Sequence, residues 1–297
     1  MRPQDGFPGK EILAVSIMGT VLVILGTRWG IGLTTDSMAY LQMADELRSG
    51  ELVLSTSTWP PLYPAALALV GGGIQKYGAV RLLQVLLAGA NVALFAALLF
   101  RLTRGNRFFI VAGSLLASLS LVTLETHTAA WSEPLFLSLL FAACFSLSLS
   151  FETQESGWAA ISLITLSLVP LTRYVGAVFL LAGWLLVLAH KQFSWTRKLF
   201  FCLFSAIPLT ALLIWNRINL GHSAGGSGLS PEWPSAEIKA GVSVVAAWIV
   251  PGIDRYRVLP HQQLLAVLLF LAWLGLLAAS FRRFPEIGSS PLGRIVT

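Results

Sequence analysis

The sequence predicts an all-α polytopic membrane protein with about eight transmembrane helices and a re-entrant or interfacial segment in its first external loop. Hydrophobic residues make up 56% of the 297 positions and charged residues only 11%, whereas about a quarter of the residues in soluble domains are charged. The mean hydropathy is +0.75. Apolar runs of about 17 to 20 residues, long enough to cross the hydrocarbon core as helices, recur along the chain.

The first apolar run covers residues 12–33 and follows Arg2 and Lys10. Because no small-x-small cleavage site follows it, we expect this run to remain as an anchored span. Residues 34–81 form the first external loop, in which a short helix is expected over residues 37–48. The other strong spans are predicted at 82–100, 108–124, 134–151, 199–215 and 264–281.

The apolar stretch 158–189 is too long for one crossing, since a helix rises about 1.5 Å per residue. Pro170, Arg173 and Tyr174 interrupt it, so we expect two short spans joined at a turn near Arg173. The chain is then a single membrane domain over residues 1–297. Its last parts are an external loop at 216–263, the span at 264–281 and a cytoplasmic tail at 282–297.

Charge decides how residues 61–75 are interpreted, because this segment is short and its three consecutive glycines weaken a helix. If the segment does not cross, the arginines at 101–107 and the basic residues at 191–198 lie on the same side as the N-terminus. That arrangement obeys the positive-inside rule. The sequence therefore predicts a plasma (inner) membrane protein with both termini in the cytoplasm.

The net charge of +6 reflects this orientation and is not interpreted as nucleic-acid binding. Cys144 and Cys202 lie inside apolar runs, without the spacing of a zinc site or a redox pair, and are interpreted as packing residues. Gln84 and Asn91 lie in the second crossing, where their amides could form hydrogen bonds between helices.

The predicted topology brings ionisable residues from distant parts of the chain to one face of the membrane. These residues are Asp36, Glu125, His127, Glu133 and Arg173. Ionisable groups at one water interface are what a reaction on a lipid-linked, negatively charged substrate requires. We therefore place the candidate active site on the external or periplasmic face.

Three segments resemble the GT-C fold glycosyltransferases that use polyprenyl-phosphate sugars, a family that includes protein O-mannosyltransferases and lipid A aminoarabinose transferases. Residues 36–64, with DSMAY and WPPLYP, resemble the first external loop of the family, which carries an essential acid. Residues 125–135, ETHTAAWSEPL, are similar to the second external loop. Residues 171–174, LTRY, are similar to an arginine-bearing turn between later spans.

The resemblance implies transfer of a sugar from a polyprenyl phosphate to a lipid, glycan or protein acceptor. Asp36 would then be the base near the acceptor, and partial burial would make it a stronger base. Arginines on the external side would bind the leaving phosphate; the candidates are Arg173, Arg28, Arg217, Arg255 and Arg257. Tyr40, Trp59 and Tyr63 would line the sugar or lipid groove.

The resemblance also implies that Glu125, His127 and Glu133 orient the acceptor or hold a divalent metal ion. Some members of the family use a metal and others do not, so no cofactor is assigned.

Each residue also has a structural interpretation. Asp36 could cap the following helix, Glu133 could complement a helix dipole, and Arg173 could snorkel or pair with a carboxylate. Two other functions remain open. One is a catalytically inactive partner of a complete transferase, because Ser37 stands where many members of the family carry a second acid. The other is a transporter or flippase of polyprenyl-linked lipids.

Overall fold

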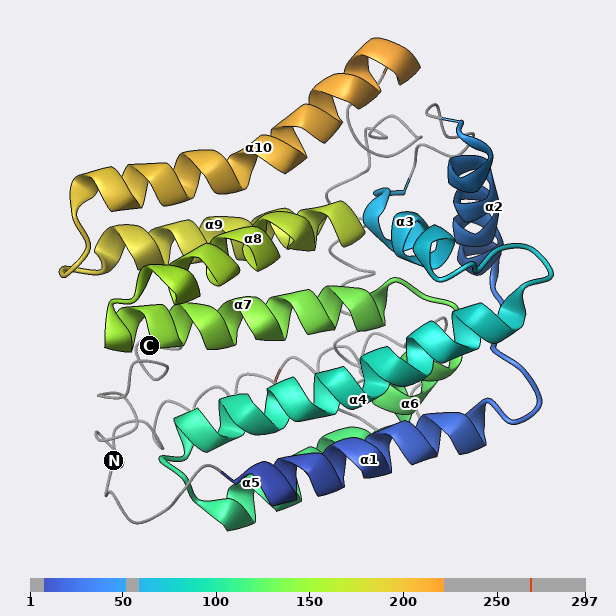
Figure 1. The fold of residues 1–297 in the computed structure, drawn as a ribbon, viewed down its shortest axis with the longest axis horizontal. Coiled ribbons are helices and arrows are strands. Elements are labelled where there is room, and N and C mark those ends of the chain that lie inside the picture. The colour runs from blue at the N-terminus through green and yellow to red at the C-terminus, as the bar shows by residue number, and fades with distance from the viewer. Residues whose placement is uncertain (1–7, 52–58, 222–267, 269–297) are drawn as a thin grey trace. The chain divides into compact units, whose positions relative to one another are not determined.

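The computed structural model describes residues 8–51, 59–221 and Leu268 (Figure 1). Contacts divide the chain into units Met1–Gly226 and Ser227–Thr297, and the helices below belong to the first. They are α1 (Gly9–Gly26), α2 (Thr35–Ser49), α3 (Leu62–Leu69), α4 (Tyr77–Leu102), α5 (Arg107–Leu119), α6 (Leu121–Thr128), α7 (Glu133–Thr153), α8 (Ser156–Thr172), α9 (Gly176–Ala189) and α10 (Trp195–Leu220). Apart from residues 216–221 and Leu268, the predicted external loop, last span and tail lie outside the described residues.

The described helices confirm an all-α fold with several membrane-length segments. Four helices, α1, α4, α7 and α10, are long and apolar enough to cross a membrane, and α5 with α6 forms a fifth such segment if the bent pair is counted as one. The helices α8 and α9 are apolar but shorter. The chain is therefore a membrane-embedded helical protein, whereas the count of eight crossings remains a prediction.

Short connections join α4 through α10. The bent pair α5–α6 continues in one direction, and the other consecutive helices lie antiparallel, as their alternating ends in Figure 1 show. The end of the bundle where α1 ends and α4 begins is called the site end below. The turn between α6 and α7 and the turn between α8 and α9 also lie there. The predicted division of residues 158–189 is confirmed, because α8 ends at Thr172 and α9 begins at Gly176.

The first and fourth helices pack closely because small residues lie between them, as is common in membranes. A side-chain carbon built on Gly89 would lie 2.5 Å from the Oγ1 of Thr20, and one built on Gly19 would lie 2.7 Å from Val92. The hydroxyl of Ser16 also donates to the carbonyl of Gly89 at 2.8 Å. This contact fixes α1 against α4.

The end opposite the site end is held by charged residues. Arg107 pairs with Glu11 at 2.7 Å, and Arg101 pairs with Glu152 near the end of α7. The guanidinium of Arg197 donates to the carbonyl of Gln154 at 3.2 Å. These arginines are among those predicted to face the cytoplasm.

Residues 61–75 form a short helix and a turn. The eight residues of α3 span about 12 Å, too little to cross a bilayer, which agrees with the prediction that this segment does not cross. The glycines form the turn after α3: Gly71 has a φ of +76°, and a side chain on Gly73 would clash with the carboxylate of Asp45. That carboxylate accepts a hydrogen bond from the backbone N–H of Ile74 at 2.8 Å, which ties α2 to the turn.

Two predicted spans differ from the observed helices. The first helix ends at Gly26, not at residue 33, because Arg81 of α4 donates to the carbonyl of Ile24 at 3.0 Å and to the hydroxyl of Thr27 at 2.9 Å. Arg28 therefore lies beyond the helix and not within it. The predicted span 108–124 is broken at Ser120, where α5 and α6 meet at a bend of 60°.

Candidate functional site

Two segments at the site end are joined by backbone hydrogen bonds. The N–H of Gly32, after α1, donates to the carbonyl of Thr128 at 2.7 Å, and the N–H of Ala130 donates to the carbonyl of Gly32 at 2.9 Å. This isolated parallel bridge pairs Gly32 with Ala129. It brings the start of α2 beside the start of α7.

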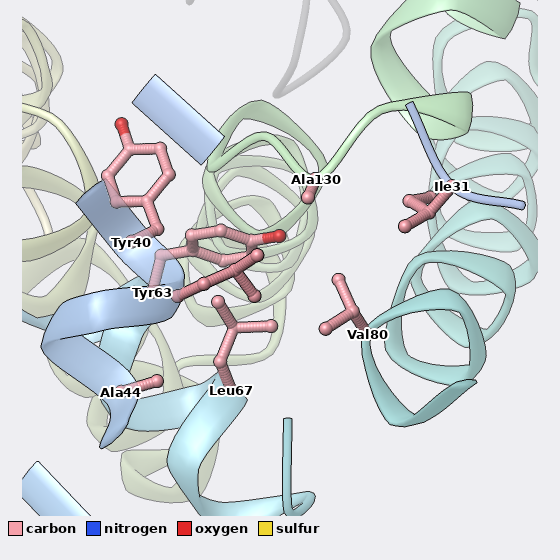
Figure 2. Close-up of a cluster of buried hydrophobic side chains, with 8 residues drawn as sticks. Ile31, Tyr40, Ala44, Tyr63, Leu67, Val80 and Ala130 are labelled. Atoms are coloured by element: carbon pink, nitrogen blue, oxygen red, sulfur yellow. The ribbon is translucent and has the colours of Figure 1, made fainter. Parts of the chain in front are cut away.

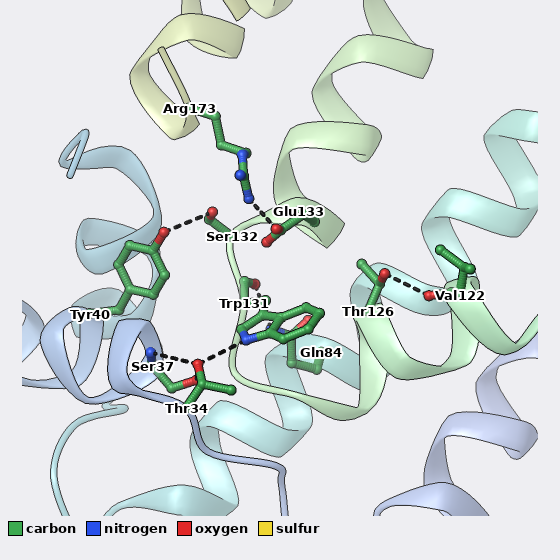
Figure 3. A network of polar contacts seen from close by, with 10 residues as sticks. All are labelled: Thr34, Ser37, Tyr40, Gln84, Val122, Thr126, Trp131, Ser132, Glu133 and Arg173. Atoms are coloured by element: carbon green, nitrogen blue, oxygen red, sulfur yellow. Dashed lines mark hydrogen bonds and ion pairs between the residues drawn. The ribbon is translucent and has the colours of Figure 1, made fainter. Parts of the chain in front are cut away.

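Thr34 is the residue that caps α2. Its hydroxyl accepts a hydrogen bond from the N–H of Ser37 at 3.3 Å and another from the indole N–H of Trp131 at 3.0 Å (Figure 3). The alternative that Asp36 caps this helix is therefore wrong. Trp131, which directly precedes the Ser132–Glu133 turn, is held against the first loop by the same hydroxyl.

Asp36 lies in the first turn of α2 and is exposed. Its carboxylate has no hydrogen bond or ion pair to any residue that the structure describes. The expected partial burial is thus not observed. The carboxylate is accessible to solvent and to a ligand.

Tyr40 lies one turn further along α2 and is 2% exposed. Its hydroxyl lies 3.1 Å from the hydroxyl of Ser132 (Figure 3). Its ring packs edge-on against Tyr63 and Trp59, with centroid distances of 5.1 and 5.6 Å. Figure 2 shows Tyr40 and Tyr63 in the cluster that also holds Leu67 and Val80.

Three charged residues affect the pKa of the Tyr40 hydroxyl. Burial raises the pKa of the Tyr40 hydroxyl above its ordinary value of 10.0, and the charges of Glu133 and Asp36 raise it further. The hydrogen bond to Ser132 and the positive charge of Arg173 act in the opposite direction. One acid of the first loop and the Glu133–Arg173 pair therefore act on the same hydroxyl.

Arg173 and Glu133 form an ion pair across the site end (Figure 3). Glu133 is the first residue of α7, and Arg173 immediately follows the last residue of α8. Both side chains are about a third exposed, at 34% for Glu133 and 35% for Arg173. The predicted alternative that Arg173 pairs with a carboxylate is thus confirmed, and Glu133 is that carboxylate.

Tyr63 is fully buried, so its hydroxyl lies away from solvent. Burial raises its pKa. The side-chain amide of Gln84 donates to this hydroxyl at 2.7 Å and to the carbonyl of Trp131 at 2.9 Å. Gln84 thus joins α4 to α3 and to the turn before α7, as predicted for an amide inside a span. Tyr63 is a packing residue here, and Trp59, which is half-buried, is the aromatic residue of this group nearest the surface.

His127 is buried and both of its ring nitrogens have partners. Its Nδ1 lies 2.8 Å from the carbonyl of Thr123, and its Nε2 lies 2.9 Å from the amide nitrogen of Asn91. Because a carbonyl can only accept, Nδ1 carries the proton and Nε2 accepts from Asn91. Asn91 also donates to the carbonyl of Pro134 at 2.9 Å and accepts from Ser138 at 2.7 Å, which confirms its predicted role between helices.

Glu125 is exposed, whereas His127 is buried. Two positions apart on a helix, the side chains point to different sides. Within the described ranges, no group of three or more His, Cys, Asp or Glu residues could hold a metal ion. The geometry therefore gives His127 a structural role between α6 and α4.

Arg28 and Arg217 do not contact this cluster. Arg28 is exposed and lies over the ring of Trp29, 5.3 Å from its centroid. Arg217 is exposed, and it donates to the carbonyl of Gly221 at 2.5 Å at the end of α10. Arg255 and Arg257 lie outside the described residues.

The residues that sequence reasoning missed are Thr34, Ser132 and Trp131 as connectors of the site. A hydroxyl one residue before Glu133 gives no signal of its own, because its partner Tyr40 is 92 positions away. Searches of family models, curated proteins and solved structures found no match to this chain.

Proposed function

We propose that this protein is an integral-membrane glycosyltransferase that moves a sugar from a polyprenyl-phosphate donor to an acceptor at the external face of the membrane. The observation that carries the proposal is the grouping of an exposed carboxylate, Asp36, with the Arg173–Glu133 pair beside the hydroxyl of Tyr40. These groups come from three separate segments of the chain. They converge at the end of the bundle where the predicted topology places the external face.

The proposed reaction needs a base and a positive charge. The acceptor hydroxyl attacks the anomeric carbon, a new C–O bond forms, and the bond from that carbon to the phosphate oxygen breaks. Asp36 takes the proton of the acceptor, for which its exposure and its lack of a partner among the described residues suit it. The polyprenyl phosphate leaves with the bonding electrons.

Arg173 stabilises the negative charge that develops on the leaving phosphate, because a guanidinium can offer two parallel N–H donors to phosphate oxygens. Arg173 directly follows the apolar helix α8, and in the predicted topology this position lies near the membrane surface, where the phosphate of a lipid-linked donor would lie. The half-buried ring of Trp59, packed against Tyr40, is suited to line the groove for the sugar or the lipid.

The test is transfer from radiolabelled polyprenyl-phosphate sugars to endogenous membrane acceptors. We compare the wild type with Asp36→Asn and Arg173→Ala at matched expression. Glu155→Gln, an exposed acid at the opposite end, is the control. Loss of transfer in both site variants but not in the control supports the proposal. If the folded wild type transfers from no donor, the inactive-partner or lipid-transporter alternative replaces it.

A further inference from the structure

The charges around Tyr40 oppose the binding of an anion. Among the described residues that act electrostatically on its hydroxyl, Asp36 and Glu133 are acids and Arg173 is the one base. An incoming phosphate thus meets two carboxylates and one guanidinium that is already paired. A lipid phosphate cannot gain the full attraction of Arg173 while Glu133 holds it.

The backbone fixes the position of Arg173. The N–H of Gly176 donates to the carbonyl of Arg173 at 2.8 Å, and a side chain on Gly176 would lie 2.6 Å from the nitrogen of Pro170. This close approach of the two helix ends leaves a narrow turn between α8 and α9. The turn therefore fixes the backbone of Arg173, and its guanidinium is paired with Glu133.

Glu133 has a second favourable partner, which is the N-terminus of its own helix. Carboxylates are stabilised in the first turn of a helix by the aligned peptide dipoles. Ser132, the preceding residue, is held by Tyr40 at 3.1 Å. Glu133 can therefore release Arg173 without losing every stabilising contact.

We infer, on the basis of the proposed function, that Glu133 competes with the phosphate of the lipid substrate for Arg173, and that its displacement accompanies substrate binding. A partly exposed ion pair contributes little stability, so an exchange of partners is feasible. A phosphate offers more acceptor oxygens than a carboxylate. Glu133 thus neutralises Arg173 while no substrate phosphate is bound.

Glu133 weakens binding of the product more than binding of the donor. A polyprenyl-phosphate sugar is a phosphodiester with one negative charge, whereas the polyprenyl phosphate left after transfer is a monoester whose second pKa is about 6. Repulsion by Glu133 and Asp36 grows with the charge of the ligand. Glu133 therefore favours release of the product over release of the donor.

The first measurement is the affinity of the purified full-length protein for a polyprenyl monophosphate in detergent micelles at low ionic strength. We expect Glu133→Gln to tighten binding by roughly three- to tenfold, and Arg173→Ala to weaken it. In the Arg173→Ala background, Glu133→Gln should tighten binding by a smaller factor, because it then removes only the repulsion between the carboxylate and the phosphate and no longer frees a guanidinium; an equal gain in both backgrounds overturns the inference. Unchanged or weaker binding by folded Glu133→Gln overturns the inference.

The control is Glu152→Gln, which removes the carboxylate of the Arg101 ion pair near the other end of α7. This variant should bind the monophosphate like the wild type. If Glu133→Gln does not fold, Glu133→Asp retains the charge but shortens the side chain and loosens its hold on Arg173. A folded Glu133→Asp variant should then bind more tightly than the wild type, and wild-type affinity overturns the inference.

A second probe is a polyprenyl phosphodiester with one charge. We expect Glu133→Gln to tighten binding of the monoester more than that of the diester, and equal gains overturn the argument on product release. The binding and transfer measurements together distinguish failure of the competition from failure of the proposed function. If transfer depends on Asp36 but Glu133→Gln leaves both affinities unchanged, only the competition fails. If the affinities change as expected but no donor supports transfer, the competition stands and the enzyme assignment fails.

Discussion

The hydroxyl of Tyr40 lies 3.1 Å from the hydroxyl of Ser132. This contact joins α2 of the first loop to the start of α7. Because Asp36 lies one turn before Tyr40 and Glu133 directly follows Ser132, the same contact sets the position of one acid relative to the other. The geometry of the site therefore depends on this single hydrogen bond.

Replacing Tyr40 with phenylalanine removes this hydrogen bond and keeps the ring cluster. We expect the free energy of unfolding to fall by about 1 kcal/mol, the usual contribution of one hydrogen bond. Thermal or denaturant unfolding in detergent measures the change. Tyr77→Phe is the matched control, because Tyr77 packs against the same cluster and its hydroxyl has no hydrogen bond to the described residues.

The same variant has a distinct dependence on pH. The pKa of Tyr40 is raised above 10.0 in the folded protein, so the unfolded chain ionises first as the pH rises. The stability that the neutral hydroxyl contributes is therefore fully present below pH 10 and is lost as the pH rises through the folded pKa. The difference in stability between the wild type and Tyr40→Phe should narrow above pH 10, and a widening difference would contradict the assignment.

Asn91→Leu removes the side-chain hydrogen bonds of Asn91 to His127, Pro134 and Ser138. We expect a loss of about 1–3 kcal/mol in the free energy of unfolding, since buried polar groups lose hydrogen bonds although such bonds are often weaker in membranes. Denaturant titration in mixed micelles measures it. Asn219→Leu serves as the control, because Asn219 is exposed on α10. Equal losses of unfolding free energy in both variants would show that the buried hydrogen bonds of Asn91 do not stabilise the protein.

Gly89→Ala places a carbon 2.5 Å from the hydroxyl oxygen of Thr20. We expect α1 to separate from α4 and stability to fall by about 1–3 kcal/mol, as in other overpacked cores. Gly78→Ala in the same helix is the control, because nothing lies within 4 Å of the added carbon. Thermal unfolding of the two variants provides the comparison, and a Gly89→Ala variant as stable as Gly78→Ala would contradict the close packing of α1 on α4.

The orientation is testable with single cysteines after Cys144 and Cys202 are replaced by alanine. Glu125→Cys lies at the site end and Lys191→Cys at the opposite end, and both residues are exposed. A membrane-impermeant maleimide should label the Glu125→Cys variant in intact cells and the Lys191→Cys variant only after permeabilisation. The reverse pattern would invert the topology and move the site to the cytoplasm.

Much of the helical layout could be predicted from the sequence, because length and hydropathy determine where apolar helices lie. The division of residues 158–189 near Arg173 and the helix over residues 37–48 are examples. Helix ends set by distant partners could not be predicted. Arg81 ends α1 through a contact with a residue 57 positions away, and the pattern of a single sequence does not indicate which distant residues are in contact.

The candidate site was predicted at the level of residue types but not of partners. Thr34, Thr35, Asp36 and Ser37 are all good N-caps, so only the observed hydrogen bond of Thr34 distinguishes among them. The burial of His127 could not be predicted either, since α5 and α6 meet at a bend that sequence hydropathy does not show. The burial of each residue depends on how the helices pack.

The bridge between Gly32 and Ala129 has a consequence for the search for relatives of this protein. Because Gly32 is anchored to the strand-like segment before α7, inserting or deleting a residue between Gly32 and Asp36 would shift α2, with Asp36 and Tyr40 together, relative to Ser132 and Glu133. The same holds for the interval between Ala129 and Glu133. Homologues that keep the site should therefore preserve these two spacings even where the residues between them have changed, and an alignment that scores gap positions would recognise them better than one that scores identity.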